Sequence, residues 1–240
     1  MFTHHRTIGF IIKKENRGES DRLFTIYTQG FGKMNFLARA ERKVKSKLRS
    51  GLELFYLSEI EFIQGKVFKT LTDAIPLNKF SEIKKDLGKL EIALRTSRLL
   101  NRLVKGEAAD EGIWNLLNDF FGMLQEWEKD RQKLKLLYFY FLWNFLSELG
   151  YRLELYKCIV CQKKLSPEKL FLNSREGGIV CQDCCSRIKG SKAVARDLIK
   201  ILRIFLEKDK ETLKRLKTGD LKELQEISRC YLLEVLEKIR

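Results

Sequence analysis

Two pairs of cysteines, each in a C-x-x-C pattern, constrain the fold of this chain more than any other feature. Cys158 and Cys161 form the first pair, and Cys181 and Cys184 form the second. Two thiolates at this spacing reach one metal ion from a tight turn, and a second such turn completes a tetrahedral shell. The pattern therefore predicts one structural zinc ion with no open coordination position. Two disulfides are the alternative, which the lack of a secretory signal disfavours, and Cys185 is the alternative to Cys184.

The first 75 residues have the alternation of hydrophobic and polar residues that is typical of β-strands. Five short strands without a long helix among them favour a small closed barrel. We expect a five-stranded OB-fold over residues 1–78, with an SH3-like barrel as the alternative. The expected strands are 7–12, 23–28, 33–39, 54–64 and 68–75.

From Ser81 onward the hydrophobic residues follow the period of a helix. The segment 134–149 is apolar nearly all round, which predicts the buried central helix of a bundle. Asp220 and Glu223 have the spacing of a capping box for the last helix. The expected fold class is thus α+β and multidomain. A helical bundle is expected in two parts, 79–155 and 191–240, which flank a zinc-binding module at 156–190.

The chain carries 47 Lys and Arg against 32 Asp and Glu, a formal net charge of +15. Such an excess points to a polyanionic partner. The densest positive stretch lies between residues 33 and 49, where Glu41 is the only acidic residue. Cations hold phosphates in single-strand-binding barrels, while exposed aromatic rings stack on bases. The candidate DNA contacts are Lys33, Arg39, Arg42, Lys43, Lys45, Lys47 and Arg49.

Candidate stacking platforms near this stretch are Tyr27, Phe31 and Phe36, for which a place in the barrel core is the alternative. A second basic group surrounds the cysteines and would contact DNA or a protein partner. Its members are Lys157, Lys163, Lys164, Arg187, Lys189 and Lys192.

The sequence shows no phosphate-binding G-x-x-x-x-G-K-[ST] string and no His–carboxylate constellation. The two histidines, His4 and His5, are expected to be solvated or to lie at a strand end. Cys230 is expected in the core of the last helix. Glu126, Glu128 and Asp130 alternate with Lys and Arg, as in solvated helix pairs. We therefore expect no enzymatic activity. Since no apolar run is long enough to span a bilayer, we expect a cytoplasmic protein without a membrane partner.

Several strings, in order along nearly the whole chain, resemble the RecO family of bacterial recombination mediators. The strings are Gly18-Glu19-Ser20-Asp21-Arg22, Thr28-Gln29-Gly30-Phe31-Gly32-Lys33, Lys45-Ser46-Lys47-Leu48-Arg49, Leu149-Gly150-Tyr151 before Cys158, and Gly177-Gly178 before Cys181. The sequence departs from the family at three places, one of which is the segment Arg152 to Leu155, where an expected proline is lacking. Ala40-Glu41 stands where members usually have a Gly-containing basic segment, and Gln162 stands where glycine is common.

The resemblance implies an OB-fold, a helical bundle and a zinc module with a role in homologous recombination, near the nucleoid during repair. It also implies binding of single- and double-stranded DNA and annealing of complementary strands. With RecR, the family promotes loading of RecA on DNA coated by single-strand-binding protein (SSB), whose acidic tail it recognises. The alternative is an RNA-binding or protein–protein adaptor with the same OB and zinc-ribbon parts but no annealing activity, which composition alone does not distinguish.

Overall fold

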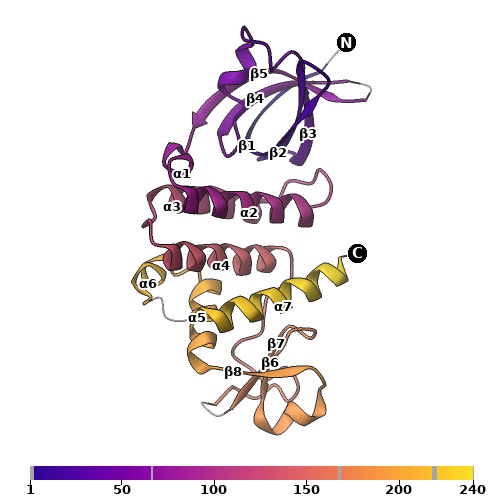
Figure 1. Cartoon of the computed structure of the whole chain (residues 1–240). Coiled ribbons are helices and arrows are strands. Elements are labelled where there is room, and N and C mark those ends of the chain that lie inside the picture. Colours follow the sequence, from indigo (N-terminus) through magenta and orange to yellow (C-terminus); the bar gives the residue numbers. More distant parts are fainter. Residues whose placement is uncertain (1–2, 66, 167–168, 218–220, 240) are drawn as a thin grey trace. The chain divides into compact units, whose positions relative to one another are not determined.

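The computed structural model describes residues 3–65, 67–166, 169–217 and 221–239 (Figure 1). The chain divides into two compact units, Met1–Lys129 and Asp130–Arg240. The division falls inside the range 79–155, which the sequence assigns to the first part of a helical bundle. Each unit is described by itself below.

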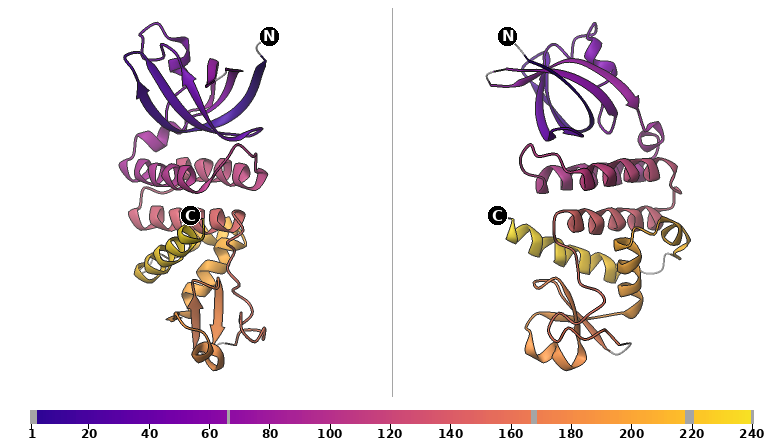
Figure 2. Two further views of the ribbon diagram at one scale, coloured as in Figure 1. Left: turned by 90° about the vertical axis from the view of Figure 1, so that its right-hand side faces the viewer. Right: turned by 180° about the vertical axis from the view of Figure 1, so that it is seen from behind.

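The first unit begins with a closed five-stranded barrel in the strand order β1-β2-β3-β5-β4. β3 and β5 run parallel and the other neighbours are antiparallel. A short 3-10 helix, η1 (Lys47–Ser50), lies between β3 and β4. This is the predicted OB-fold, and Figure 2 shows the strands closing round their core from two further directions. The strands are β1 (His4–Arg17), β2 (Asp21–Thr28), β3 (Gly32–Ala38), β4 (Leu57–Gln64) and β5 (Lys69–Asn78).

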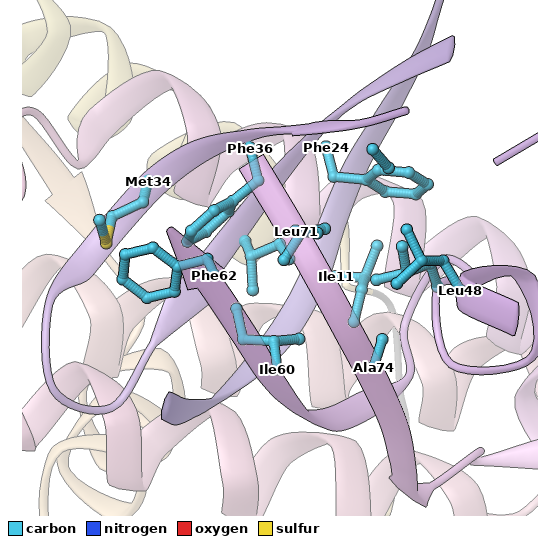
Figure 3. Packing of buried hydrophobic residues seen from close by; sticks show 12 residues of the cluster. Ile11, Phe24, Met34, Phe36, Leu48, Ile60, Phe62, Leu71 and Ala74 are labelled. Atoms are coloured by element: carbon cyan, nitrogen blue, oxygen red, sulfur yellow. The ribbon is translucent and has the colours of Figure 1, made fainter. Parts of the chain in front are cut away.

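Alternate side chains of the strands fill the barrel, as the two-residue period of a strand requires. Met34 and Phe36 of β3 meet Ile60 and Phe62 of β4 in this core (Figure 3). The rings of Phe36 and Phe62 pack edge to face with centroids 4.9 Å apart. The inward alternation of β3 therefore places Lys33 and Asn35 on its outer face.

A second set of buried side chains joins the barrel to the three helices that follow it. Ile11 points into the barrel core, and Phe10, the residue before it, points to the other face of β1. The centre of the Phe10 ring lies 5.2 Å from that of Phe121 and 5.4 Å from that of Trp114. β1 is thus buried on both faces, because α2 and α3 lie across one end of the barrel. The helices are α1 (Ser81–Lys84), α2 (Leu87–Leu103) and α3 (Glu111–Glu126).

In its described residues, the second unit combines four α-helices with a three-stranded antiparallel sheet of order β7-β6-β8. α4 is buried nearly all round, as predicted, and its polar side chains have partners: Trp143 Nε1 donates to Ser228 Oγ at 3.0 Å, and Asn144 Nδ2 donates to Phe205 O at 2.8 Å. The elements are α4 (Arg131–Glu148), β6 (Leu170–Asn173), β7 (Gly178–Cys181), η2 (Gln182–Arg187), β8 (Ser191–Val194), α5 (Arg196–Leu206), α6 (Lys210–Arg215) and α7 (Lys222–Lys238).

Some local predictions for this unit were wrong. The helical bundle is expected to resume at residue 191, but β8 occupies this position and pairs with β6. Asp130 is not part of a solvated helix pair, because its carboxylate caps α4 by accepting from Lys133 N at 2.8 Å. Asp220 of the expected capping box lies outside the described residues, and Glu223 accepts a hydrogen bond from Ala195 N at 2.9 Å. Among the described helices, none is both long and apolar enough to cross a bilayer.

Truncating Phe121 should test how strongly the helices stabilise the barrel. Its ring contacts those of Phe10, Phe55 and Phe80 and is 1% exposed. Phe121→Ala should lower the free energy of unfolding by about 3–5 kcal/mol, because it leaves a cavity among these rings. Urea denaturation followed by tryptophan fluorescence measures the loss. Leu87→Ala, at a side chain that is 85% exposed, should change stability by less than about 0.5 kcal/mol; equal losses would contradict the packing described.

Candidate metal centre and nucleic-acid interface

The four cysteines of the two C-x-x-C pairs come together in the second unit. The Sγ atoms of Cys158, Cys161, Cys181 and Cys184 all lie within 4.8 Å of one another, and those of Cys161 and Cys181 are 3.9 Å apart. A tetrahedral site with metal–sulfur bonds of about 2.3 Å has sulfur–sulfur edges of about 3.8 Å, so the cluster fits one metal ion. All six cysteines of the chain lie within the described ranges, and all are free thiols. Cys185 stands outside the cluster.

Local backbone geometry brings the two pairs face to face. In the first turn, Gln162 N donates to Cys158 O at 2.8 Å, with Gln162 in the left-handed region at φ 60°. The second pair begins at the end of β7, which follows the predicted hairpin of Gly177 and Gly178. A Cβ on Gly178 would lie 2.4 Å from Ile159 Cγ2. Glycine therefore lets β7 approach the first turn, where Ile159 N donates to Ile179 O at 3.0 Å.

The thiols differ in how readily they ionise. Burial opposes ionisation of Cys158, but backbone amides of Cys161 and Cys181 donate to its sulfur and lower its pKa to about 6. Burial, with hydrogen bonding to the other cysteines, raises the pKa of Cys184 to about 12. The pKa of Cys181 is also raised, first by burial, so Cys181 and Cys184 resist ionisation beside Cys158, and a bound cation would relieve this resistance.

The basic stretch forms the loop after β3, together with η1. We call the exposed cations of this segment the basic loop: Arg39, Arg42, Lys43, Lys45, Lys47 and Arg49. Lys33, also a predicted contact, is not among them. It lies near the opposite end of β3, roughly 20 Å away at about 3.3 Å per residue, and its Nζ donates to Asn101 O at 2.7 Å.

Glu41, the one acidic residue of this stretch, does not weaken the charge of the loop surface. Its side chain is 0% exposed, and Oε2 lies 3.1 Å from Nη1 of Arg22 on β2. The ion pair places the negative charge inside and leaves the cations of the basic loop exposed. The sequence shows Glu41 only as the one exception to the positive run, and no pattern in it indicates that the side chain is buried.

Further hydrogen bonds fix the path of the basic loop against the turn between β1 and β2. Asp21 Oδ1 accepts from Ala40 N at 2.8 Å, and Arg42 N donates to Ser20 O at 3.0 Å. Ala40 takes the left-handed conformation at φ 52°, which costs an L-residue about 1–2 kcal/mol. The loop therefore has a defined backbone even though its cations extend into solvent.

The predicted stacking platforms do not lie beside the basic loop. Tyr27 and Phe36 are 0% exposed, so the alternative assignment to the core is correct for both. Phe31 is half-buried at the opposite end of β3 from the basic loop. Its ring packs edge to face against those of His5 and Phe62, with centroids 5.7 Å away in each case. His5 lies near the start of β1, as the expectation of a strand end requires, and its ring packs against Phe31 and Phe62 at this end of the barrel.

The second basic group is exposed around the metal centre. All its members, Lys157, Lys163, Lys164, Arg187, Lys189 and Lys192, are on the surface of the unit. Lys192 Nζ lies 3.4 Å from Glu226 of α7, and 3.9 Å from the sulfur of Cys230. Cys230 is half-buried and not in the core as expected.

Comparison with known proteins assigns both parts of the chain to one family. The family models "Recombination protein O N terminal" and "Recombination protein O C terminal" match residues 1–80 and 84–240. A curated relative named DNA repair protein RecO, from Dehalococcoides mccartyi strain 195, is 32% identical over 97% of this chain and 91% of its own length. A relative of the same name from Roseiflexus sp. RS-1 is 29% identical over 98% of this chain and 82% of its own length. Another, from Acetivibrio thermocellus, is 28% identical over 97% of this chain and 92% of its own length. The chain therefore belongs to the RecO family of DNA repair proteins.

Proposed function

We propose that this protein is a non-enzymatic recombination mediator that binds single- and double-stranded DNA and anneals complementary strands. The basic loop is the observation that carries the proposal. Its cations are exposed, its backbone is fixed to the barrel, and Glu41 is buried against Arg22. Such a surface binds phosphates without regard to sequence. Family membership supports DNA as the polyanion in preference to RNA.

Annealing requires no bond chemistry from the protein. Two complementary strands repel each other, and a cationic surface that neutralises phosphates on one strand lowers the repulsion when the second strand approaches. Base pairing then supplies the free energy. The exposed cations around the metal centre would be a second phosphate contact or would contact a protein partner.

The proposed protein partners are RecR and SSB, through which the chain would help RecA load on SSB-coated DNA. The acidic tail of SSB needs an apolar cleft with a basic rim. The second unit has a cleft of about 180 Å³ between α5 and the residues Leu165 and Leu170, the second of which begins β6. Leu165, Leu170 and Ile199 supply its apolar lining, and Arg196 and Lys200 are exposed beside them. We place the SSB tail in this cleft.

Zinc is the metal that the cysteine cluster fits best. Four thiolates in a tetrahedral arrangement are typical of structural zinc sites, which contribute directly to folding. The ion would hold together the two cysteine turns of a small module whose buried cluster is limited to Cys158, Val180 and Cys184, with partly buried neighbours.

Neutralising the basic loop tests the DNA-binding proposal. If about five cations contact phosphate, the logarithm of the association constant for a single strand should fall against log salt with a slope near −3.5. The triple variant Lys43→Gln, Lys45→Gln, Lys47→Gln should weaken the slope by about 2 and slow annealing of two complementary SSB-coated oligonucleotides. Fluorescence anisotropy and a quenching assay measure the two effects.

The control for this variant removes three other exposed cations of the first unit, by Lys79→Gln, Arg98→Gln and Arg102→Gln. The control keeps the net charge equal and should retain most of the affinity. Equal losses in the two variants would show that net charge, and not the basic loop, drives binding. Absence of annealing by the unaltered protein at low salt would favour the adaptor.

Substitution of neighbouring cysteines tests the metal centre. Cys184→Ser should abolish binding of one zinc ion per chain, because it removes a sulfur of the cluster, whereas Cys185→Ser should leave it unchanged. Mass spectrometry of the native protein measures the metal content. Loss of zinc from the Cys185 variant alone would contradict the arrangement of ligands.

A charge-matched pair of substitutions tests the anchor of the basic loop. Glu41→Gln and exposed Glu19→Gln each raise the net charge by one, so electrostatics alone predicts slightly tighter DNA binding by both. Because Glu41→Gln leaves Arg22 without its ion-pair partner, at a cost of about 1–3 kcal/mol, it should instead lower DNA affinity by roughly 3- to 10-fold. Equal or tighter binding by Glu41→Gln than by Glu19→Gln, measured by anisotropy, would refute the anchor.

A further inference from the structure

A polar cleft opens on the barrel where β3 and β5 separate. These two strands pair only at Phe36 with Lys69 and at Leu37 with Thr70. Beyond that point the start of β3, the end of β4, residues 67–69 and the segment between α2 and α3 line a cleft of about 390 Å³. This volume is in the range of small-molecule sites, about 300–1,000 Å³. The side chains that matter below are Lys33, Asn35, Gln64, Phe68, Lys69 and Glu107.

The cleft is built from side chains that the barrel core does not use. Met34 and Phe36 point into the core (Figure 3), so Lys33 and Asn35 face the cleft from the outer side of β3. Thr25 Oγ1 donates to Asn35 Oδ1 at 2.8 Å, which orients the Asn35 amide. Asn35 and exposed Gln64 thus place two amide groups at the cleft, each with donor and acceptor atoms.

Phe68 gives the cleft an aromatic wall. The side chain is half-buried, and the guanidinium carbon of Arg17 lies 4.1 Å from the centre of its ring. Such a cation–π contact holds the ring in place. A preoriented ring beside amide groups is the arrangement that stacks on an unpaired base and hydrogen-bonds its edge.

The cations of the cleft are partly engaged by the protein itself. Lys69 Nζ lies 2.6 Å from Glu107 Oε1, and Lys33 Nζ donates to Asn101 O. Burial lowers the pKa of Lys33, which an adjacent anion would oppose. The cleft thus has two cations, Lys33 and Lys69, against the one carboxylate of Glu107, and Arg17 adds a third positive charge beside Phe68, so that the cleft can accept a phosphate.

We propose that this cleft takes up one unpaired nucleotide of a DNA single strand, with its base against Phe68 and its phosphate near Lys69 and Lys33. The inference rests on the proposed DNA binding and adds to it a reason for discriminating single strands from duplex. A paired base is stacked and hydrogen-bonded inside a duplex and does not reach Phe68, whereas phosphates of either form reach the basic loop. Because the cleft lies at the start of β3 and the basic loop follows its end, a strand along the outer face of β3 would contact both.

Binding measurements with Phe68→Leu test the proposal. The variant should bind a thymidine oligonucleotide roughly 5- to 100-fold more weakly than the unaltered chain, as expected for loss of one stacked base. Its affinity for a blunt duplex should stay within about twofold, and Phe68→Trp should restore single-strand binding. Leu77→Ala, at a 51% exposed side chain of β5 that does not line the cleft, is the control and should bind like the unaltered protein. Circular dichroism checks that each variant is folded.

An oligonucleotide made entirely of abasic residues supplies the second arm. It keeps the phosphates but has no bases, so the unaltered protein and Phe68→Leu should bind it equally. Unchanged single-strand affinity in Phe68→Leu, or an equal loss on duplex and abasic strands, would overturn the cleft assignment and leave the basic-loop proposal standing. Absence of salt-sensitive DNA binding by the unaltered protein would overturn both.

Discussion

The buried ion pair of Arg22 and Glu41 is the interaction on which the proposed DNA-binding surface depends. Burying a charge is costly unless a partner compensates it, and here Arg22 compensates the carboxylate at 3.1 Å. The pair removes the single negative side chain of the basic stretch from the surface and attaches the loop to β2. Asp21 adds a second attachment through Ala40 N. Acidic residues thus organise a surface whose function requires positive charge.

The cysteine cluster has a comparable organising role in the second unit. Strands β6, β7 and β8 have four residues each, and the buried cluster beside them is small. A module of this size gains little from burial of hydrophobic surface and needs a cross-link or a metal. The metal centre would therefore position the surrounding cations, without any part in chemistry. In both units, a few polar contacts hold a cationic surface in a defined shape.

The spacing of residues was sufficient to predict the barrel and the cysteine cluster, because both depend on local periodicity and on ligand geometry. The spacing was insufficient to predict which aromatic side chains are exposed and which are buried. Both faces of β1 are buried, by the barrel core and by α3, so alternation does not tell which rings are exposed. β8 escaped prediction because its residues lie partly or fully exposed. Ala40 and Gln162, where the sequence departs from family glycines, have φ of 52° and 60°, so the backbone keeps the left-handed conformation that glycine adopts at less cost.

Amide hydrogen exchange of the intact protein, with and without a saturating single-stranded oligonucleotide, tests the central claim most directly. If the anchored basic loop holds the DNA backbone, exchange should slow in residues 39–47 when DNA binds, because ordering of the cations stabilises the loop. Unchanged exchange in residues 39–47, with protection confined to the second unit, would contradict the account and would place the DNA on the surface around the metal centre.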